Sequence, residues 1–504
     1  MTVAETMRAV RFVRRARSGG YSPGNTAYAV YIAVMLTALV LAPLLRLAVV
    51  GMAQPAVLAV LQAPGASVVT GAAIGLFFAG MALLGRVRGP VLLSPFLTVA
   101  IAGNPFPRRQ TLRRSFLVSA VILIALVTGA GVIVAAVLAT AGYATWASAI
   151  AFLAGLLLSC ALAAVAWLAG QVLPTRRASL LAGAITLVTV ATTLAPGAEI
   201  IAPWGWVSLL YPAGAVPAWA PLGALLALAV LAFVCVGPLL DRLSGAAMLA
   251  QARRWQLVGI FGATGDLASA LAQFRALPQT GRTWSAVRGN HLAVTFLIRD
   301  LIGSLRTPAR FVAAAVTLGG AGFLMAIAIA AAPSVMWLPT LTGSILCYLA
   351  LGVWSDGFRH AIEAAAAAPL YGVRSGRLLL LHSILPVLCV LVFAGAGAVV
   401  STASGAPVLG VFAAITISLF AVTMRIFDSA KGPMPLALLA PVPTPLGDFS
   451  GLLVLYWQAD AVIITGMVAT ALTLAAASAA IWLSLFLPAA AVMLVLTRRR
   501  LARL

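Results

Sequence analysis

The sequence is dominated by long apolar runs that carry almost no charge, such as 116–141 and 219–240. A helix needs about 20 consecutive apolar residues to cross a bilayer, and the chain offers about a dozen runs of that length. A transmembrane β-barrel requires strands that alternate apolar and polar residues instead. Only 8% of the residues are charged, against about 25% in a typical soluble domain. The sequence therefore predicts an all-α, polytopic membrane protein.

The spacing of the apolar runs predicts about twelve transmembrane helices in two six-helix halves. The predicted spans are 28–50, 68–86, 116–141, 145–172, 179–202, 218–240, 310–331, 338–355, 377–401, 406–424, 450–470 and 473–496. The predicted segments are a basic interfacial stretch (1–27), a first transmembrane half (28–240), a cytoplasmic connector (241–309), a second transmembrane half (310–496) and a basic tail (497–504). Within the connector, apolar residues at helical spacing over 292–310 predict an interfacial helix that leads into the seventh span.

The chain has 32 Lys and Arg residues against 10 Asp and Glu residues. If the predicted spans alternate across the membrane from a cytoplasmic N-terminus, every basic residue except Arg46 falls on the cytoplasmic side. Multispanning proteins have this positive-inside distribution. Adding or removing one span would invert everything after it and destroy the partition. The charge distribution therefore predicts that both termini are cytoplasmic, and the expected partner is the bilayer rather than a nucleic acid.

The sequence contains no P-loop for binding a nucleotide. That motif, GxxxxGK[ST], needs a lysine to hold the phosphates, and the only lysine, Lys431, precedes Gly432 and Pro433. The 4 cysteines and 3 histidines stand apart, without the spacing of metal ligands. We expect no cofactor and no metal in this chain.

Two predicted cytoplasmic stretches, 86–115 and 356–377, present basic and apolar residues together. A stretch with both kinds of residue could bind a soluble cytoplasmic protein that supplies the energy for transport. The candidate contact residues are Arg108, Arg109, Arg113 and Arg114 in the first stretch, and Arg359, Glu363 and Arg374 in the second. The alternative is that both are ordinary solvated loops with the basic bias of any cytoplasmic loop.

Asp460 stands inside the predicted span 450–470, where a carboxylate in hydrocarbon is costly unless it is paired, hydrated or protonated. With Gln458 and Trp457 beside it, Asp460 is a candidate for the substrate path. The alternative is a structural contact between helices, because polar side chains also hold membrane helices together. His382 lies alone in an apolar run, which favours a packing or interfacial role over metal binding.

Several stretches of the sequence resemble permeases of the ABC-2 type. They are the basic segment before the first span, LLSP (92–95) and PRRQTLRR (107–114) between the second and third spans, PWGWVSLLYPAG at 203–214, and APVPTPLGD at 440–448. The chain is most similar to the fused two-half permeases of actinobacteria. The resemblance implies an exporter of drugs, lipids or polysaccharides in the bacterial plasma membrane, with a short re-entrant outer segment at 203–214. It also implies a separate P-loop ATPase subunit, as a dimer, that binds the ATP and Mg²⁺.

The predicted function is therefore the permease subunit of an ATP-driven exporter for an apolar or amphipathic cargo, without enzymatic activity of its own. The alternative is an ion- or proton-coupled secondary transporter that uses Asp460 as its ion site. However, the stretch between the second and third spans, GRVRGPVLLSP, has no acidic residue, unlike the GxxxDRxGRR-like signature of the best-known superfamily of that class. A membrane-embedded enzyme is a third class, and it needs carboxylates grouped near one membrane face. The acidic residues of this chain are scattered instead.

Overall fold

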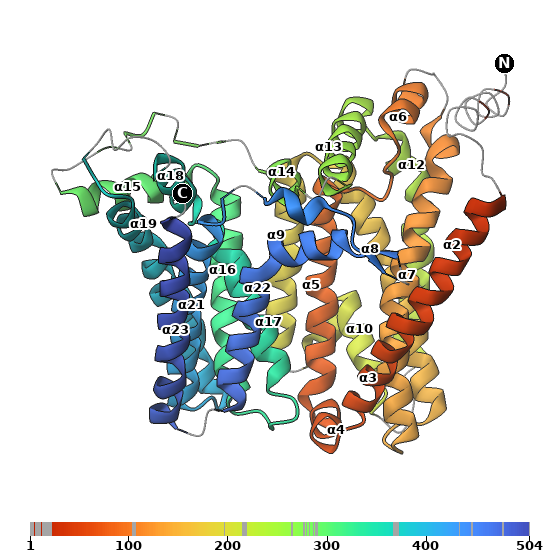
Figure 1. Cartoon of the computed structure of the whole chain (residues 1–504). Coiled ribbons are helices and arrows are strands. Elements are labelled where there is room, and N and C mark those ends of the chain that lie inside the picture. The colour runs from red at the N-terminus through yellow and green to blue at the C-terminus, as the bar shows by residue number, and fades with distance from the viewer. Residues whose placement is uncertain are drawn as a thin grey trace. The chain divides into compact units, whose positions relative to one another are not determined.

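Figure 1 shows the computed structural model of the chain, which consists almost entirely of helices. The structure describes residues 23–102, 107–195, 197–213, 219–263, 266–275, 291–365, 372–432, 434–444, 447–475 and 478–502, together with positions 5, 12, 278, 280–281, 283–285 and 287. Most of the predicted interfacial stretch 1–27 lies outside the described residues. The chain divides into two compact units, Met1–Ala263 and Thr264–Leu504. The boundary between the units lies within the predicted connector 241–309.

The described part of the first unit is helical. Its elements are α2 (Pro23–Leu36), a π-helical turn η1 (Thr37–Leu41), α3 (Ala42–Met52), α4 (Pro55–Gln62), α5 (Gly65–Val87), α6 (Pro95–Ala102), α7 (Arg108–Thr140), α8 (Trp146–Val172), α9 (Thr175–Leu194), a 3₁₀ turn η2 (Ala198–Ile201), α10 (Pro203–Leu209), α11 (Trp219–Val234), α12 (Val236–Asp241) and α13 (Gly245–Ala263). The long helices α5, α7, α8, α9 and α11 run side by side, while α6 and α13 lie together at one end of this unit.

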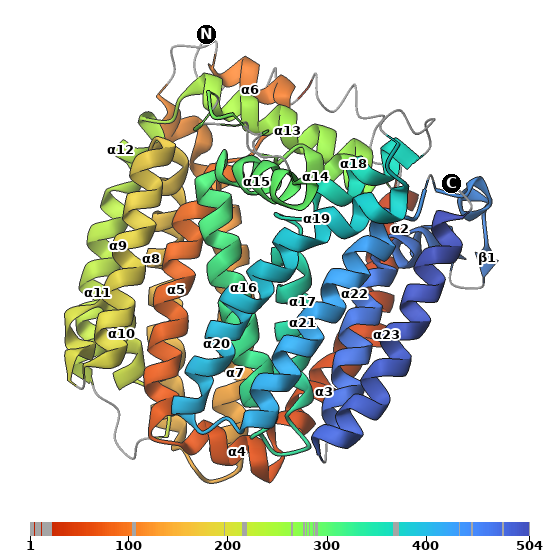
Figure 2. The same ribbon diagram turned by 90° about the vertical axis from the view of Figure 1, so that its left-hand side faces the viewer.

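The second unit is also helical, apart from two short strands. Its elements are α14 (Leu267–Ala272), α15 (Leu292–Leu305), α16 (Pro308–Ala328), α17 (Trp337–Leu351), α18 (Asp356–Ala365), α19 (Ser375–Cys389), a π turn η3 (Val390–Ala394), α20 (Gly395–Val400), a 3₁₀ turn η4 (Ser401–Ser404), α21 (Val408–Ser429), a 3₁₀ turn η5 (Leu436–Leu439), antiparallel β1 (Pro443–Thr444) and β2 (Gly447–Asp448), α22 (Ser450–Leu474) and α23 (Ala479–Leu501). Helices α16, α20, α21, α22 and α23 run alongside one another in Figure 2.

Among the described residues, ten helices are long and apolar enough to cross a membrane, or up to twelve if each of two bent pairs is one span. Each predicted span overlaps one of these helices or pairs. Many of their apolar side chains are exposed, including those of Leu126, Leu187, Val316 and Leu380. Such large apolar surfaces are stable in hydrocarbon and not in water. The chain is therefore a multi-pass membrane protein.

Proline explains where two of the long helices depart from regular geometry. Pro43 has no amide hydrogen to donate to the preceding turn, and that turn, η1, is widened into a π turn. Pro386 in α19 likewise cannot donate to the carbonyl of His382, and the π turn η3 begins four residues later, directly after the end of α19. After α3 the chain bends by 73° into α4, so the first predicted span ends in a bent pair rather than in a simple helix. The predicted fifth span, 179–202, ends as an α-helix at Leu194.

In the first unit, α5 packs directly against α8. A Cβ atom at Gly170 of α8 would overlap the backbone carbonyl of Ala82 in α5, so only glycine permits this approach. The surrounding core contains Phe78, Phe152 and Leu156. Small residues at helix crossings let membrane helices gain van der Waals contact.

The short helix α10 packs against α5 and α8 and does not cross the bundle. Its Trp204 and Val207 side chains are buried. Tyr211, just after the helix, donates its hydroxyl hydrogen to the Leu61 carbonyl at 2.9 Å. Within the stretch 203–214, where the resemblance implies a short re-entrant outer segment, the structure has the short helix α10, and Tyr211 joins it to the end of α4.

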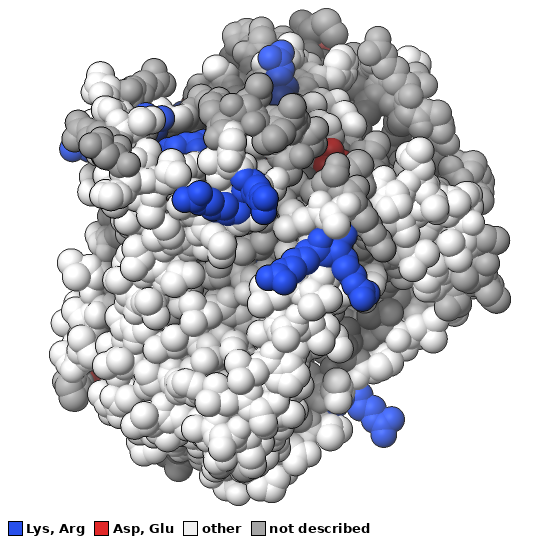
Figure 3. All heavy atoms as spheres, turned by 60° about the vertical axis from the view of Figure 1, so that its left-hand side comes forward, with Lys and Arg blue, Asp and Glu red and all other residues white. Residues whose placement is uncertain are grey.

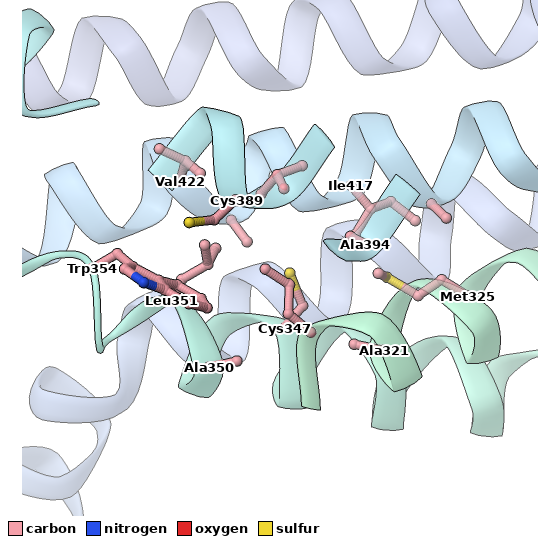
Figure 4. Close-up of a cluster of buried hydrophobic side chains, with 14 of the residues drawn as sticks. Ala321, Met325, Cys347, Ala350, Leu351, Trp354, Cys389, Ala394, Ile417 and Val422 are labelled. Carbon is pink, nitrogen blue, oxygen red and sulfur yellow. The ribbon is translucent and has the colours of Figure 1, made fainter. Parts of the chain in front are cut away.

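The second unit has its own apolar core between α16, α17, α19 and α21 (Figure 4). Cys347 and Leu351 of α17 lie in this cluster together with Cys389 of α19 and Ile417 of α21. Trp354, at the end of α17, stacks on Phe393 with the ring centroids 6.0 Å apart. This packing holds the end of α17, where the chain bends by 59° into α18.

Candidate functional site

Basic side chains gather at one end of the first unit and tie its helices together there. The Arg86 guanidinium donates to the Leu173 carbonyl at 2.9 Å and to Thr175 Oγ1 at 3.1 Å, which joins the end of α5 to the turn between α8 and α9. Arg109 joins the start of α7 to the end of α12 through Asp241. On the face shown in Figure 3, most Lys and Arg side chains lie above a broad surface without charge. A bilayer that ends at the basic side chains accounts for this distribution.

The turn between α5 and α6 is held by two buried amides. Gln171 of α8 donates from Nε2 to the Val91 carbonyl at 2.9 Å, and Val91 N donates to Gln171 Oε1 at 3.3 Å. Gln251 of α13 accepts a second hydrogen bond from Gln171 at 3.0 Å and donates to the Gly85 carbonyl at 3.0 Å. A Cβ atom at Gly89 would overlap the Gln171 carboxamide. Only glycine at position 89 therefore leaves room for the hydrogen bonds that Gln171 makes with this turn.

Two indole groups bind the same turn from either side. Trp167 of α8 donates to the Arg88 carbonyl at 2.6 Å, and Trp255 of α13 donates to the Val87 carbonyl at 2.9 Å. The Arg88 guanidinium lies over the Trp255 ring, 5.4 Å from its centroid, a cation–π contact. The exit of α5 is therefore a stiff connection, because buried hydrogen bonds from two other helices fix its backbone.

The predicted stretch 86–115 contains a short helix, α6, in its middle, and is therefore not an ordinary solvated loop. This short apolar helix buries Thr98 and Ile101 and packs on α13, while Phe96 and Val99 on its other side are about half exposed. In an element so short, an exposed phenylalanine and valine form an apolar contact surface next to basic residues.

The four predicted arginines of that stretch lie on the first two turns of α7, not in a loop. Arg108 is half-buried, and Arg109, Arg113 and Arg114 are exposed. The backbone N–H of Arg109 donates to Asp241 Oδ1 at 2.9 Å, and its Nε lies 3.8 Å from Oδ2. Because α7 has 33 residues, it is about 50 Å long. That exceeds the hydrocarbon thickness of about 30 Å, so its basic turns project beyond it.

In the second unit, α18 occupies the place that α6 has in the first, between the second and third long helices. Asp356 at its start is 3.3 Å from Arg275 Nη2 and 3.8 Å from Arg310 Nη1. Phe358 is fully buried, so the first turn of α18 is anchored in the core. The stretch 366–371 lies outside the described residues.

The predicted contact residues of this second stretch are separated by the structure. Arg359 lines a depression of about 330 Å³ together with Arg310, Arg425 and Asp428. Glu363 Oε2 lies 3.6 Å from His360 Nδ1 on the exposed surface of α18. Arg374 is exposed and immediately precedes α19. Only Arg359 therefore belongs to a concave cationic surface, while Glu363 and Arg374 lie on the open surface.

Asp460 is paired with two cations. Its Oδ1 lies 2.5 Å from Lys431 Nζ, and its Oδ2 accepts a hydrogen bond from Arg500 Nη2 at 3.1 Å. Its side chain is 10% exposed and that of Lys431 is 8% exposed. Asp460 Oδ1 and Lys431 Nζ are close enough for an ion pair. The angles between the two groups do not meet the criteria of a hydrogen bond. The carboxylate therefore links the end of α21 and the end of α23 to α22.

Further polar contacts extend this ion pair into a network. Lys431 Nζ is also 2.8 Å from Asp428 Oδ1 and donates to the Gln458 carbonyl at 3.0 Å. Asp428 Oδ2 accepts a hydrogen bond from the Tyr348 hydroxyl at 2.9 Å. Lys431 Nζ lies 5.3 Å from the centroid of the Trp457 ring. Gln458 and Trp457, the predicted companions of Asp460 in the substrate path, thus both contact the lysine, one through its backbone and one through its ring.

The partners also show at what level of the bundle Asp460 lies. Lys431 follows the last residue of α21 by two positions, and Arg500 is the penultimate residue of α23. Asp460, the eleventh of the 25 residues of α22, therefore lies level with the basic ends of α21 and α23. From Asp460 to Leu474 the helix rises about 21 Å. The first turns of α22 expose Leu452 and Tyr456, as suits a segment at the membrane interface.

A buried hydrogen-bond contact joins the predicted interfacial helix to the bundle. The expected helix over 292–310 is present as α15, and its Asp300 Oδ2 lies 2.6 Å from His382 Nδ1 of α19. The His382 side chain is 3% exposed. Phe296 packs edge-on against the imidazole, with centroids 4.8 Å apart. His382 thus has the packing role that was expected, and Asp300 is a partner that the sequence did not indicate.

No three His, Cys, Asp or Glu side chains of the described residues come together as a metal site requires. Comparison of the chain with protein-family models, with curated proteins and with solved structures gives no match. The geometry of the chain itself must therefore carry the functional argument.

Proposed function

We propose that this chain is the permease subunit of an ATP-driven exporter in the bacterial plasma membrane, similar to the ABC-2 type. In this proposal two fused six-helix halves place both termini and all the basic helix ends in the cytoplasm, as the charge distribution along the sequence favours. A separate P-loop ATPase dimer binds ATP and Mg²⁺ and moves the permease. The cargo is apolar or amphipathic.

The observation that carries the proposal is the recurrence of a short, anchored helix at the same place in each unit. In the first unit α6 follows the second long helix, and in the second unit α18 does so. Each lies at the end of its unit where the basic residues gather. A membrane protein driven by a soluble motor needs protruding elements of this kind.

The anchoring of these helices suits the transmission of force. The turn before α6 is fixed by hydrogen bonds from Gln171 and Trp167 of α8. Gln171 is itself hydrogen-bonded to Gln251 of α13. The start of α18 is fixed mainly by the buried Phe358 side chain, with smaller contributions from the exposed ion pairs of Asp356. A displacement imposed on either helix is therefore passed to the spans, since packed interiors have low compressibility.

The alternative of a secondary transporter assigns an ion site to Asp460. For that role the carboxylate would have to leave both Lys431 and Arg500 during each cycle. Breaking a buried pair costs about 3–5 kcal/mol when one partner is removed. The anchored short helices have no evident use in such a transporter, and for this reason we favour the exporter.

The test is purification of the tagged, full-length protein from its native membrane in a mild detergent. We expect a P-loop ATPase to co-purify in a fixed ratio and to hydrolyse ATP. Reproducible absence of such a subunit, with cargo transport in proteoliposomes driven by an ion gradient alone, would refute the exporter and favour the secondary transporter.

A further inference from the structure

A groove of about 430 Å³ runs between α7 and the α11–α12 pair in the first unit. Its lining is contributed by one face of each helix. The lining residues are Arg109, Gln110, Arg113, Phe116 and Leu117 from α7, and Phe233, Val236, Gly237 and Leu240 from α11 and α12. Neither the two short anchored helices nor the buried ion pairs contribute to this groove.

The polarity of the groove changes along its length. Arg109 and Arg113 are four residues apart on α7 and therefore lie on the same face, one turn from each other. The next turn of that face presents Phe116 and Leu117, and the opposite wall is apolar. The groove thus has a cationic end and an apolar continuation toward the middle of the helices.

The cationic end keeps an excess of positive charge. Asp241 approaches Arg109, but only at 3.8 Å from Nε, and the Arg109 side chain is 62% exposed. Arg113 has no carboxylate within ion-pair distance among the described residues. Arg114 adds a further charge on the neighbouring position of α7. An anion in the groove would therefore meet at least one guanidinium that is free of competition from Asp241.

The apolar part of the groove opens on surface that suits lipid. Phe233 is 48% exposed, and Val230 and Leu231 on the preceding turn of α11 are more exposed still. On α7, Val121 and Leu126 are exposed as well. The groove therefore begins at the level of the basic helix ends and continues along helices whose apolar surface faces outward.

We infer that this groove binds one anionic phospholipid. Its phosphate contacts Arg113 and Arg109, and its acyl chains lie along Leu117, Phe233 and Gly237, which line the groove without being buried. The order of the lining fits this occupant: two arginines stand where a headgroup lies, and apolar side chains follow in the direction of the bilayer. Basic pockets between transmembrane helices on the cytoplasmic side bind acidic headgroups in this way. A soluble anion would leave the apolar length unused, and a zwitterionic lipid would gain little from the arginines.

The inference is tested by counting the lipids that remain bound to the purified, full-length protein. The protein is placed in micelles that contain equal amounts of phosphatidylglycerol and phosphatidylcholine, and native mass spectrometry measures how much of each lipid stays bound. We expect the wild type to retain phosphatidylglycerol in preference, and Arg113→Gln to lower that retention about fivefold. Arg109→Gln with Arg113→Gln abolishes the preference.

A second variant tests the apolar part without changing charge. A Cβ atom at Gly237 meets no heavy atom within 4 Å, so Gly237→Leu can fold and fills part of the groove. It should reduce retention of both lipids at this site. Matched controls are Arg176→Gln, which removes an exposed arginine outside the groove, and Gly223→Leu, at a position of α11 with equally open space. Both controls should bind lipid as the wild type does.

Three results would overturn the inference. The first is equal retention of phosphatidylglycerol and phosphatidylcholine by the wild type. The second is unchanged retention in the double arginine variant and in Gly237→Leu, with melting curves that show both variants to be folded. The third is complete displacement of phosphatidylglycerol by inorganic phosphate, which would assign the arginines to a soluble anion. None of these results depends on whether the chain works with an ATPase.

Discussion

Lys431 and Asp460 form a buried ion pair, with Nζ 2.5 Å from Oδ1, between the turn after α21 and the second quarter of α22. The only lysine of the chain is thus the partner of the carboxylate that stands out most in its apolar runs. Asp428 and Arg500 complete an arrangement of alternating charge. Opposite charges at the same level of three helices offset the cost of removing each from water.

We predict that Lys431→Met destabilises the protein more than Asp460→Asn does. Removing the lysine leaves two carboxylates, Asp428 and Asp460, without their shared cation, and the expected cost is about 3–5 kcal/mol. In Asp460→Asn the Lys431 side chain keeps its ion pair with Asp428, so the loss in the free energy of unfolding is smaller. The free energy of unfolding in mixed micelles measures both.

The control for this comparison is Asp356→Asn. Asp356 also contacts two arginines, but the pairs are 35–46% exposed, and an exposed ion pair contributes at most about 1 kcal/mol. A loss from Lys431→Met no larger than that of Asp356→Asn would contradict the role of the buried network.

The positions of the spans were predictable because the signal is local. A run of about 20 apolar residues specifies a membrane helix by itself, and the helices found here overlap those runs. Helix α6 was missed, because eight apolar residues between basic ones are too few for a span and read as part of a loop. The first turns of α7 were assigned to the same loop, since nothing in PRRQTLRR marks a helix start without its partner Asp241.

The partners of the buried polar groups were not predictable, because they are distant in the sequence. Asp460 was singled out by its apolar surroundings, whereas Lys431 served only to exclude a P-loop. Gln171 and Gln251 passed unnoticed, although an uncharged amide within or beside an apolar helix is a signal for a contact between helices. A polar residue within an apolar run indicates that its side chain needs a partner. Only the packing of the helices shows which residue that partner is.

We predict that Gly89→Ala disrupts the turn between α5 and α6. Its methyl group would overlap the Gln171 carboxamide, and displacing that amide leaves buried polar groups of the turn without partners. The expected loss is about 1–3 kcal/mol. Thermal unfolding in detergent measures it.

Gly80→Ala is the matched control for that variant. Gly80 lies in α5, and a Cβ atom there meets no heavy atom within 4 Å. Replacing a glycine within a helix by alanine stabilises by about 0.5–1 kcal/mol. Equal melting temperatures for Gly89→Ala and Gly80→Ala would show that the amide network does not depend on Gly89.

The pair Asp300–His382 is predicted to hold α15 against α19. Asp300→Asn or His382→Leu weakens or removes this contact, and we expect faster backbone hydrogen exchange over Leu292–Leu305, because local opening exposes a helix that has lost its anchor. Hydrogen exchange with mass spectrometry reads this segment directly. His360→Gln, which removes an exposed histidine paired within α18, should leave exchange in α15 unchanged. Unaltered exchange after loss of Asp300 would show that apolar packing alone fixes α15.

Within the proposed function, α6 and α18 are predicted to contact the ATPase. Phe96→Glu places a charge on the exposed apolar side of α6, and Arg359→Glu reverses a charge on α18. Neither change is expected to unfold the protein. Each should weaken association by about tenfold, which corresponds to about 1.4 kcal/mol at an interface. Replacing both Arg108 and Arg109 by Glu tests the predicted arginines of α7 in the same way. Co-purification at graded salt concentration gives the comparison.

Arg176→Glu is the control, because it reverses an exposed charge at the same end of the first unit but on α9. If the ATPase co-purifies with every variant as with the wild type, the exporter stands but α6 and α18 are not its contact surfaces. If α6 and α18 transmit force, the two single variants must each lower the ATPase activity that the permease stimulates. Because each unit has one such helix, the double variant must lose more than either single variant, and a double variant that equals Phe96→Glu would leave α18 without a part in coupling.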